Sequence, residues 1–172
     1  RAPDDARALQ LAAANELRLK SVAGAEVHLK RLVNVQPKAP QPRQQLAQIY
    51  IRKGQPGRAL EVLRPLIDSP AADSDSLTLA GEALLQTGDL AGAEAHYARA
   101  LKADPRATTA RTALALGQVA RGNAAAGFAE LEAAAAADPG IRADMALVAA
   151  RLRSKDIPGA LKAIDALEKK QP

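Results

Sequence analysis

The stretch that decides the fold runs from Leu84 to Glu94 and reads LLQTGDLAGAE. A helix is expected to stop at Gly88, because glycine adopts at little cost the left-handed conformation that ends helices. The next helix is expected to start after Asp89, whose carboxylate can accept hydrogen bonds from the unpaired amides of a first helical turn. The stretch therefore predicts two helices joined by a tight turn.

The same pattern recurs along the whole chain. Small residues that follow the turn are spaced by 34, 34, 34 and 33 positions, at Ala25, Ala59, Ala93, Gly127 and Ala160. Prolines keep nearly the same step, at Pro37, Pro70, Pro105, Pro139 and Pro172. A fixed period of this length is typical of helical solenoids, in which each repeat buries its apolar face only against its neighbours.

Each repeat has its own expected helix stop and helix start. The stops are Lys20, Gly54, Gly88, Gly122 and Lys155, and the residues that follow them are Ser21, Gln55, Asp89, Asn123 and Asp156. Four of these five followers are good helix N-caps, and Pro56 and Pro158 fall in first turns, where proline is tolerated. Because lysine replaces glycine at two stops, the first helices of repeats one and five could be shifted by one residue.

The register predicts an all-α fold, a right-handed α-α superhelix of about five helix pairs. We expect ten antiparallel helices, at residues 6–19, 22–36, 40–53, 56–68, 74–87, 90–103, 108–121, 124–137, 141–154 and 157–170. Residues 1–172 would form a single array with repeats at 6–39, 40–73, 74–107, 108–140 and 141–172. The proline-rich run 36–42 could be an interdomain linker, but the register favours a stiff turn between repeats.

The composition narrows the classes of function. Alanine and leucine dominate and only 2% of residues are aromatic, which favours helix over strand. The net charge of +5 comes from charges of both signs that are interspersed along the chain. This pattern is typical of solvated helix faces and argues against nucleic-acid binding. No cysteine is present, and no apolar run approaches the roughly 18 residues of a membrane-spanning helix.

Residues that could carry chemistry are few. His28 and His96 lie two repeats apart, which places them roughly 20 Å or more apart, too far to share a metal, and we expect both on an exposed outer face. The oxygen-rich residues 73–76 lack the spacing of a calcium loop and fit helix caps better. No serine–histidine pair, glycine-rich phosphate loop or cysteine nucleophile is evident. The sequence predicts no enzymatic activity, no cofactor and no metal site.

The repeat resembles the tetratricopeptide repeat, a helix pair of about 34 residues with small, large, glycine, alanine and proline residues at fixed positions. The third repeat carries the whole pattern, at Gly81, Leu84, Gly88, Ala93, Tyr97, Ala100 and Pro105. The fourth departs from it with Gln118 at the large position and Gly127 in place of alanine. The resemblance implies a protein-binding scaffold whose first helices line a concave groove for a peptide or a helix.

The residues of the expected groove follow from this resemblance. They are Gln44, Gln48, Arg52, Thr78, Glu82, Leu85, Thr112, Leu116, Val119, Met145, Leu152 and Arg153. The groove changes from glutamine-rich in the second repeat to apolar in the last two. The apolar side chains either belong partly to the core or bind an apolar peptide or helix, with Met145 adapting its shape. The lysine and asparagine of carboxylate-clamp members are absent, and the groove positions hold no aromatic residue that could stack on a polysaccharide.

A narrower resemblance rests on residues 144–152 and 156–172, which are similar to repeat proteins of exosortase (PEP-CTERM) exopolysaccharide systems in Gram-negative bacteria. Those proteins are long arrays thought to be exported, often as lipoproteins. The resemblance implies a segment of a longer array, in the periplasm or anchored to the outer membrane, with a cytoplasmic location as the alternative. It also leaves a second function open, a carbohydrate-binding module of the exopolysaccharide machinery.

The end of the array carries one more expectation. Solenoids need polar capping elements at their ends, and the last helix presents Leu161, Ile164 and Leu167. Weak end-to-end self-association is therefore expected.

Overall fold

The computed structural model describes residues 5–170, and all regular structure in this range is helical. The ten helices are α1 (Ala6–Arg18), α2 (Val22–Val35), α3 (Pro40–Arg52), α4 (Pro56–Ile67), α5 (Ser74–Thr87), α6 (Leu90–Ala103), α7 (Thr108–Ala120), α8 (Ala124–Ala137), α9 (Arg142–Arg153) and α10 (Ile157–Lys170). Each begins and ends within one residue of its expected bounds. The predicted fold class is confirmed, since ten helices in this order are consistent with an α-α solenoid of about five helix pairs.

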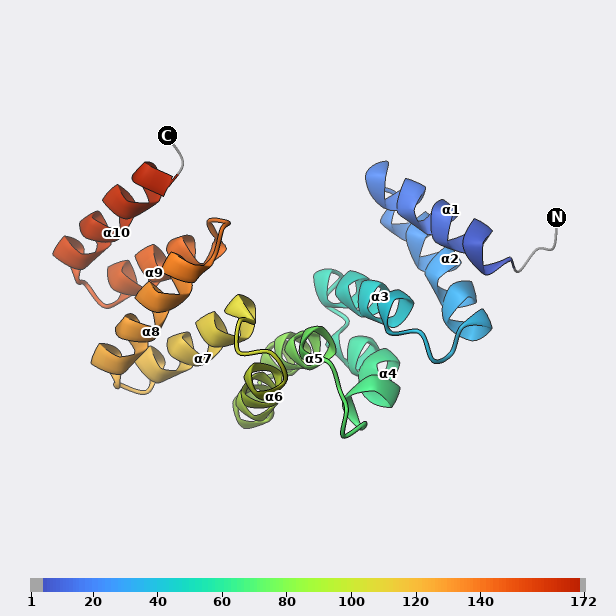
Figure 1. Ribbon diagram of the computed structural model, residues 1–172, viewed down its shortest axis with the longest axis horizontal. Coiled ribbons are helices and arrows are strands. Elements are labelled where there is room, and N and C mark those ends of the chain that lie inside the picture. The colour runs from blue at the N-terminus through green and yellow to red at the C-terminus, as the bar shows by residue number, and fades with distance from the viewer. Residues whose placement is uncertain (1–4, 171–172) are drawn as a thin grey trace. The chain divides into compact units, whose positions relative to one another are not determined.

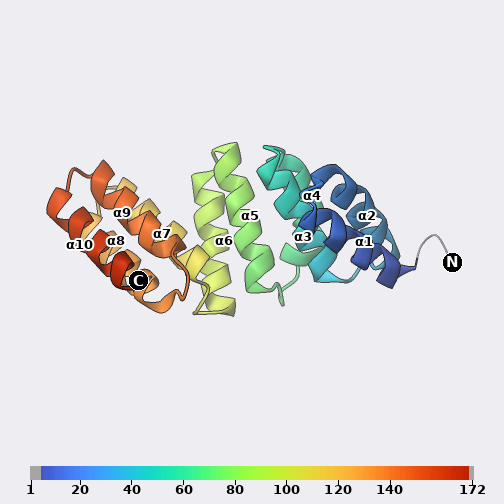
Figure 2. The same cartoon turned by 90° about the horizontal axis from the view of Figure 1, so that it is seen from above.

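The chain divides into two compact units, unit 1 up to Ala93 and unit 2 from Glu94. In unit 1, α1 packs on α2 and α3 packs on α4 as antiparallel pairs, and α3 also lies beside α5 (Figure 1). In unit 2, α7 pairs with α8 and α9 pairs with α10, while α7 also contacts α9 (Figure 2). Within each unit, first helices therefore pack on first helices of the next pair. A single array over the whole chain stays a prediction, and Pro172 lies outside the described residues.

All five expected helix stops adopt the left-handed conformation. The φ angles are 66° at Gly54, 84° at Gly88, 88° at Gly122 and 58° at both Lys20 and Lys155. The lysines thus take the same conformation as the glycines, and the possible shift of the first helices in pairs one and five does not occur. Packing on both sides of each turn maintains the register despite the steric cost of a Cβ atom at positive φ.

The helix starts agree only partly with expectation. Asp89 Oδ1 accepts a hydrogen bond from the Gly92 amide at 2.9 Å, and Asp156 Oδ1 accepts one from the Gly159 amide at 3.0 Å. The expected caps at Ser21 and Asn123 are wrong in one respect, because these residues occupy the N-cap position without a side-chain capping bond. At both, the backbone ψ angle is well below the extended value seen at Asp73.

The small residues after each turn are buried. Ala25, Ala59, Ala93 and Ala160 are at most 1% exposed. At the fourth of these positions, a Cβ atom on Gly127 would lie 2.8 Å from the Ala115 carbonyl oxygen and 2.9 Å from the Val119 nitrogen. The backbones of α7 and α8 thus approach too closely for alanine, which explains the glycine that departs from the repeat pattern.

Two of the turns between pairs are held by arginine side chains. Arg43 Nε donates a hydrogen bond to the Pro37 carbonyl oxygen at 3.1 Å, and Arg111 Nη2 donates one to the Pro105 carbonyl oxygen at 2.8 Å. Because α2 also packs directly on α3, residues 36–39 form a short turn between repeats and not a linker, and Pro40 and Pro42 already belong to the first turn of α3. The same arginine contact therefore recurs two pairs later along the chain.

Candidate interaction surface

The expected groove residues of unit 1 lie on α3 and α5. Gln44 Nε2 donates hydrogen bonds to Asp73 Oδ1 at 2.8 Å and to Ser76 Oγ at 3.0 Å, and these bonds tie α3 to α5. Asp73 also caps α5 by accepting a bond from the Ser76 amide at 2.9 Å, as the residues 73–76 led us to expect. Thr78 is buried, so it offers little surface to a ligand. The remaining four are exposed or half-buried: Gln48, Arg52, Glu82 and Leu85.

In unit 2 the apolar groove residues separate into two groups. Leu116 and Val119 on α7 are half-buried and pack against the core formed by Ala115, Phe128, Leu131, Leu147, Ala150 and Ala163. Thr112 is also buried. Leu116 and Val119 thus belong partly to the core, which is one of the two alternatives left open by the sequence. Met145 and Leu152 on α9, in contrast, are 53% and 49% exposed.

The exposed side chains of α9 form one stripe. Arg142, Met145, Ala149, Leu152 and Arg153 are spaced by three, four, three and one residues, which places them on one face of a helix. We call these five residues the α9 stripe. Both arginines are exposed, and neither forms an ion pair or hydrogen bond with another residue in the range 5–170. The stripe is thus an apolar strip with a free positive charge at each end.

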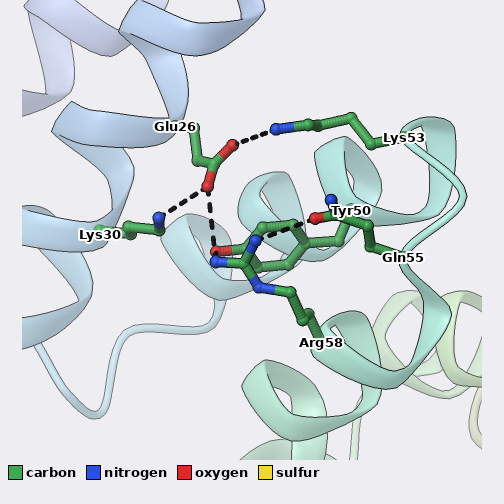
Figure 3. Close-up of polar contacts among 6 residues, drawn as sticks. All are labelled: Glu26, Lys30, Tyr50, Lys53, Gln55 and Arg58. Atoms are coloured by element: carbon green, nitrogen blue, oxygen red, sulfur yellow. Dashed lines mark hydrogen bonds and ion pairs between the residues drawn. The ribbon is translucent and has the colours of Figure 1, made fainter.

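Sequence reasoning missed a buried carboxylate, Glu26 on α2, which joins pair one to pair two (Figure 3). Its Oε1 atom lies 2.6 Å from Lys30 Nζ and 3.6 Å from Arg58 Nη2, and its Oε2 atom lies 2.7 Å from Lys53 Nζ. The hydrogen bonds from Lys30 and Lys53 outweigh the effect of burial and lower the pKa of Glu26 to about 2. The hydrogen bond between Lys30 and Glu26 also raises the pKa of Lys30. One clue was available in the sequence, because a pair with the same spacing, Glu94 and Arg121, recurs two repeats later and also forms an ion pair.

Arg58 completes this Glu26 cluster from α4. Its guanidinium carbon lies 4.3 Å from the centroid of the Tyr50 ring, in the geometry of a cation–π contact. Its Nη2 atom donates to Tyr50 Oη at 3.0 Å and its Nη1 atom donates to Gln55 Oε1 at 2.9 Å. The cluster therefore connects α2, α3 and α4 and sets how pair one sits on pair two.

Arg151 plays the corresponding part between pairs four and five. Its guanidinium carbon lies 3.9 Å from the centroid of the Phe128 ring, and its nitrogens bond Glu132 Oε1 at 2.7 Å and Asp156 Oδ2 at 2.5 Å. The backbone bond from Gly159, and then Arg151, lower the pKa of Asp156. Arg151 thus joins α8, α9 and the turn before α10.

The two histidines are less exposed than the sequence predicted. His28 and His96 are both half-buried, so the expected exposed position is wrong. The ring of His28 is partly covered, and its Nδ1 atom is buried without a hydrogen bond. Among the residues that the structure describes, no three metal-ligating side chains gather in one place. No helix within 5–170 combines the length and the apolar character needed to cross a bilayer.

Comparison with known proteins gives one family and several related folds. A family model of the tetratricopeptide repeat matches residues 45–108, while no curated protein matches the sequence. A thermophilic tetratricopeptide repeat protein of Thermus thermophilus has a similar structure, with a TM-score of 0.82 and 18% identity over 98% of this chain and 92% of that one. PilW, a type IV pilus biogenesis factor, has a TM-score of 0.78 and 14% identity over 98% of this chain and 79% of that one.

A third similar structure is YrrB, described as a tetratricopeptide repeat protein with an unusual peptide-binding site. It gives a TM-score of 0.64 and 15% identity over 99% of this chain and 89% of that one. At such identities the likeness concerns the fold alone. The tetratricopeptide repeat model matches residues 45–108, less than half of the chain, and the related structures show that the fold of an α-α solenoid extends over nearly all of it.

Proposed function

We propose that this chain is a non-enzymatic protein–protein interaction scaffold and that the α9 stripe binds a short peptide or helix. The single observation that carries this proposal is the exposure of Met145 and Leu152 on one face of α9, between two free arginines. Tetratricopeptide repeats in general support protein interactions, and YrrB is described by its peptide-binding site. The partner would present apolar side chains between acidic ones.

The spacing of the stripe defines the partner further. Met145 and Leu152 are seven residues apart, which corresponds to about 10 Å along a helix, and Arg142 and Arg153 are about 16 Å apart. An amphipathic helix with anchors seven residues apart matches the two apolar side chains. Carboxylates near its two ends would lie within reach of the arginines. Methionine adds a flexible side chain that can adapt to different apolar partners.

The experiment compares matched exposed sites. An immobilised array of 15-residue peptides, with apolar and acidic residues in varied spacing, is probed with the wild-type chain and with Met145→Glu/Leu152→Glu. Leu11→Glu on α1 is the control, since Leu11 is 64% exposed and lies outside the α9 stripe. We expect the double variant to lose the peptides that the wild type and the control retain. Equal binding by all three proteins would refute the site. Leu116 is not used, because a charge there would disrupt the core of unit 2.

A role in an exopolysaccharide or protein-sorting system, with a periplasmic or outer-membrane-anchored location, remains our proposal from the sequence resemblance. The alternative function, a carbohydrate-binding module, has less support. Tyr50, Tyr97 and Phe128, the only aromatic residues of the chain, are all buried and cannot stack on sugar rings. Saturable heat in a calorimetric titration with the exopolysaccharide would favour the alternative over peptide binding.

A further inference from the structure

A second surface of unit 2 has the form of a ligand site. A cleft of about 430 Å³ opens between α8 and α10, with α9 as its floor, and is lined by Glu132, Ala135, Ala136, Asp144, Leu147, Gly159, Lys162, Ala163, Ala166 and Lys170. Its volume lies at the lower end of the roughly 300–1,000 Å³ that ligand pockets span. Asp144 and Leu147 face the cleft, so the cleft and the α9 stripe involve different residues of α9.

Small residues line the α10 side of the cleft. Gly159, Ala163 and Ala166 of α10 each lie 101 positions after Arg58, Val62 and Pro65 of α4, which hold the same places in pair two. In unit 1 the Arg58 side chain bonds Tyr50 and Gln55. In unit 2 the equivalent of Arg58 is Gly159, which has no side chain, and the side chains of Asp156 and Arg151 lie next to it.

The charges around the cleft are paired except for one. Lys170 Nζ lies 2.8 Å from Asp144 Oδ2 and donates to the Ala135 carbonyl oxygen at 2.8 Å, which closes one end of the cleft. Glu132 is bound by Arg151 at 2.7 Å. Lys162 is exposed and has no ion pair or hydrogen bond with any residue between 5 and 170. The cleft therefore presents an apolar interior with one free ammonium group at its side.

We propose that this cleft binds a small amphipathic organic anion, with its apolar body against Ala163, Ala166 and Leu147 and its acidic group on Lys162. An apolar body gains from leaving water, and the anion gains a charge-assisted hydrogen bond from Lys162. A cationic ligand would find no free carboxylate, because Asp144 and Glu132 are already paired. A neutral apolar molecule would leave Lys162 unused.

The test uses two probes that differ in charge. The anion is 8-anilinonaphthalene-1-sulfonate and the neutral counterpart is N-phenyl-1-naphthylamine; both become fluorescent in apolar sites. We expect saturable binding of the sulfonate to the wild type. Lys162→Gln should weaken it about tenfold without changing the neutral probe, as loss of a charged hydrogen bond implies. Ala166→Phe should abolish the binding of both probes, because it fills the cleft.

Each variant has a matched control. Lys169→Gln removes a charge from the same helix outside the cleft, and Ala98→Phe adds a phenyl ring at an exposed position of α6. Both should bind the sulfonate as the wild type does. The proposal is overturned if the sulfonate does not saturate, if Lys169→Gln weakens it as much as Lys162→Gln, or if Ala166→Phe still binds.

Amide chemical shifts give an independent readout. With the sulfonate bound, we expect changes at Gly159, Ala163 and their neighbours on α8. Changes confined to other surfaces of the chain would equally refute the site. Met145→Glu should leave the sulfonate binding unchanged. A negative result for the cleft would therefore not refute peptide binding by the α9 stripe, and a negative result for the stripe would not refute the cleft.

Discussion

Replacing Lys20 or Lys155 by glycine should stabilise the protein. Both lysines have a φ of 58°, a left-handed conformation that costs a residue with a Cβ atom roughly 1–2 kcal/mol. Glycine removes this cost but loses about 0.5–1 kcal/mol because its unfolded chain is more flexible. We therefore expect a net gain of about 0.5–1 kcal/mol for each variant. Since Lys20 lies in unit 1 and Lys155 in unit 2, the two gains should add.

The structure allows a reciprocal change at the glycine stops. No heavy atom lies within 4 Å of a Cβ atom built on Gly54, Gly88 or Gly122, so an alanine there meets no neighbour and only the backbone term changes. Gly88→Ala should therefore destabilise by about 1 kcal/mol. Gly57→Ala is the control, because Gly57 has equally open surroundings but lies in helix α4 without a positive φ. There the same replacement should be neutral or stabilising.

Urea unfolding followed by circular dichroism at 222 nm measures these changes through the transition midpoints. Repeat proteins can depart from two-state unfolding, so midpoints of variants in the same unit are compared with one another. If Lys20→Gly and Lys155→Gly lower the midpoint, or if Gly88→Ala behaves like Gly57→Ala, the left-handed conformation does not limit stability at these turns.

Three further predictions concern other sites. Gly127→Ala should destabilise unit 2 by about 1–3 kcal/mol although it restores the repeat pattern, because its Cβ atom meets backbone atoms of α7; a thermal melt that matches the wild type would contradict this. Glu26 has a pKa of about 2 in the folded protein against 4.5 ordinarily, so its contribution to stability is present above pH 4.5 and is lost as the pH falls towards 2. Glu26→Gln should lower stability near neutral pH and reduce its decline in this acidic range, and parallel pH profiles for variant and wild type would disprove the assignment. Leu161, 57% exposed on α10, should support weak self-association that Leu161→Glu reduces; light scattering that shows a monomer at all concentrations would exclude it.

The helices were predictable because their signals are local. Glycine or lysine at a stop and aspartate at a start act on the few residues next to them, and five copies in register remove most ambiguity. Burial within the groove was not predictable in this way. Leu116 and Met145 hold groove positions on equivalent helices, yet Leu116 packs against the core while Met145 remains exposed. The difference depends on which side chains the neighbouring helices supply.

The charged clusters needed contacts that a scan for short motifs does not reveal. Glu26 and Lys53 belong to different helix pairs and are distant in the sequence, and each charge alone resembles a solvated surface residue. On the α10 side of the cleft, Gly159, Ala163 and Ala166 stand where pair two has Arg58, Val62 and Pro65. This difference does not by itself predict a cleft, because neighbouring side chains such as Arg151 and Asp156 beside Gly159 decide how much of the space is filled.

The arginine contacts at the turns have a consequence for rearranging this protein. Arg43 with Pro37 and Arg111 with Pro105 lie two helix pairs apart in the sequence, as do the ion pairs Glu26–Lys53 and Glu94–Arg121. The backbone repeats every pair, but these polar contacts repeat every second pair. Shortening or lengthening the chain by one helix pair would therefore bring mismatched side chains together at the new junction. Shortening or lengthening the chain by two helix pairs would instead keep matching side chains at the junction. A block of four helices is therefore the natural module for engineering this chain.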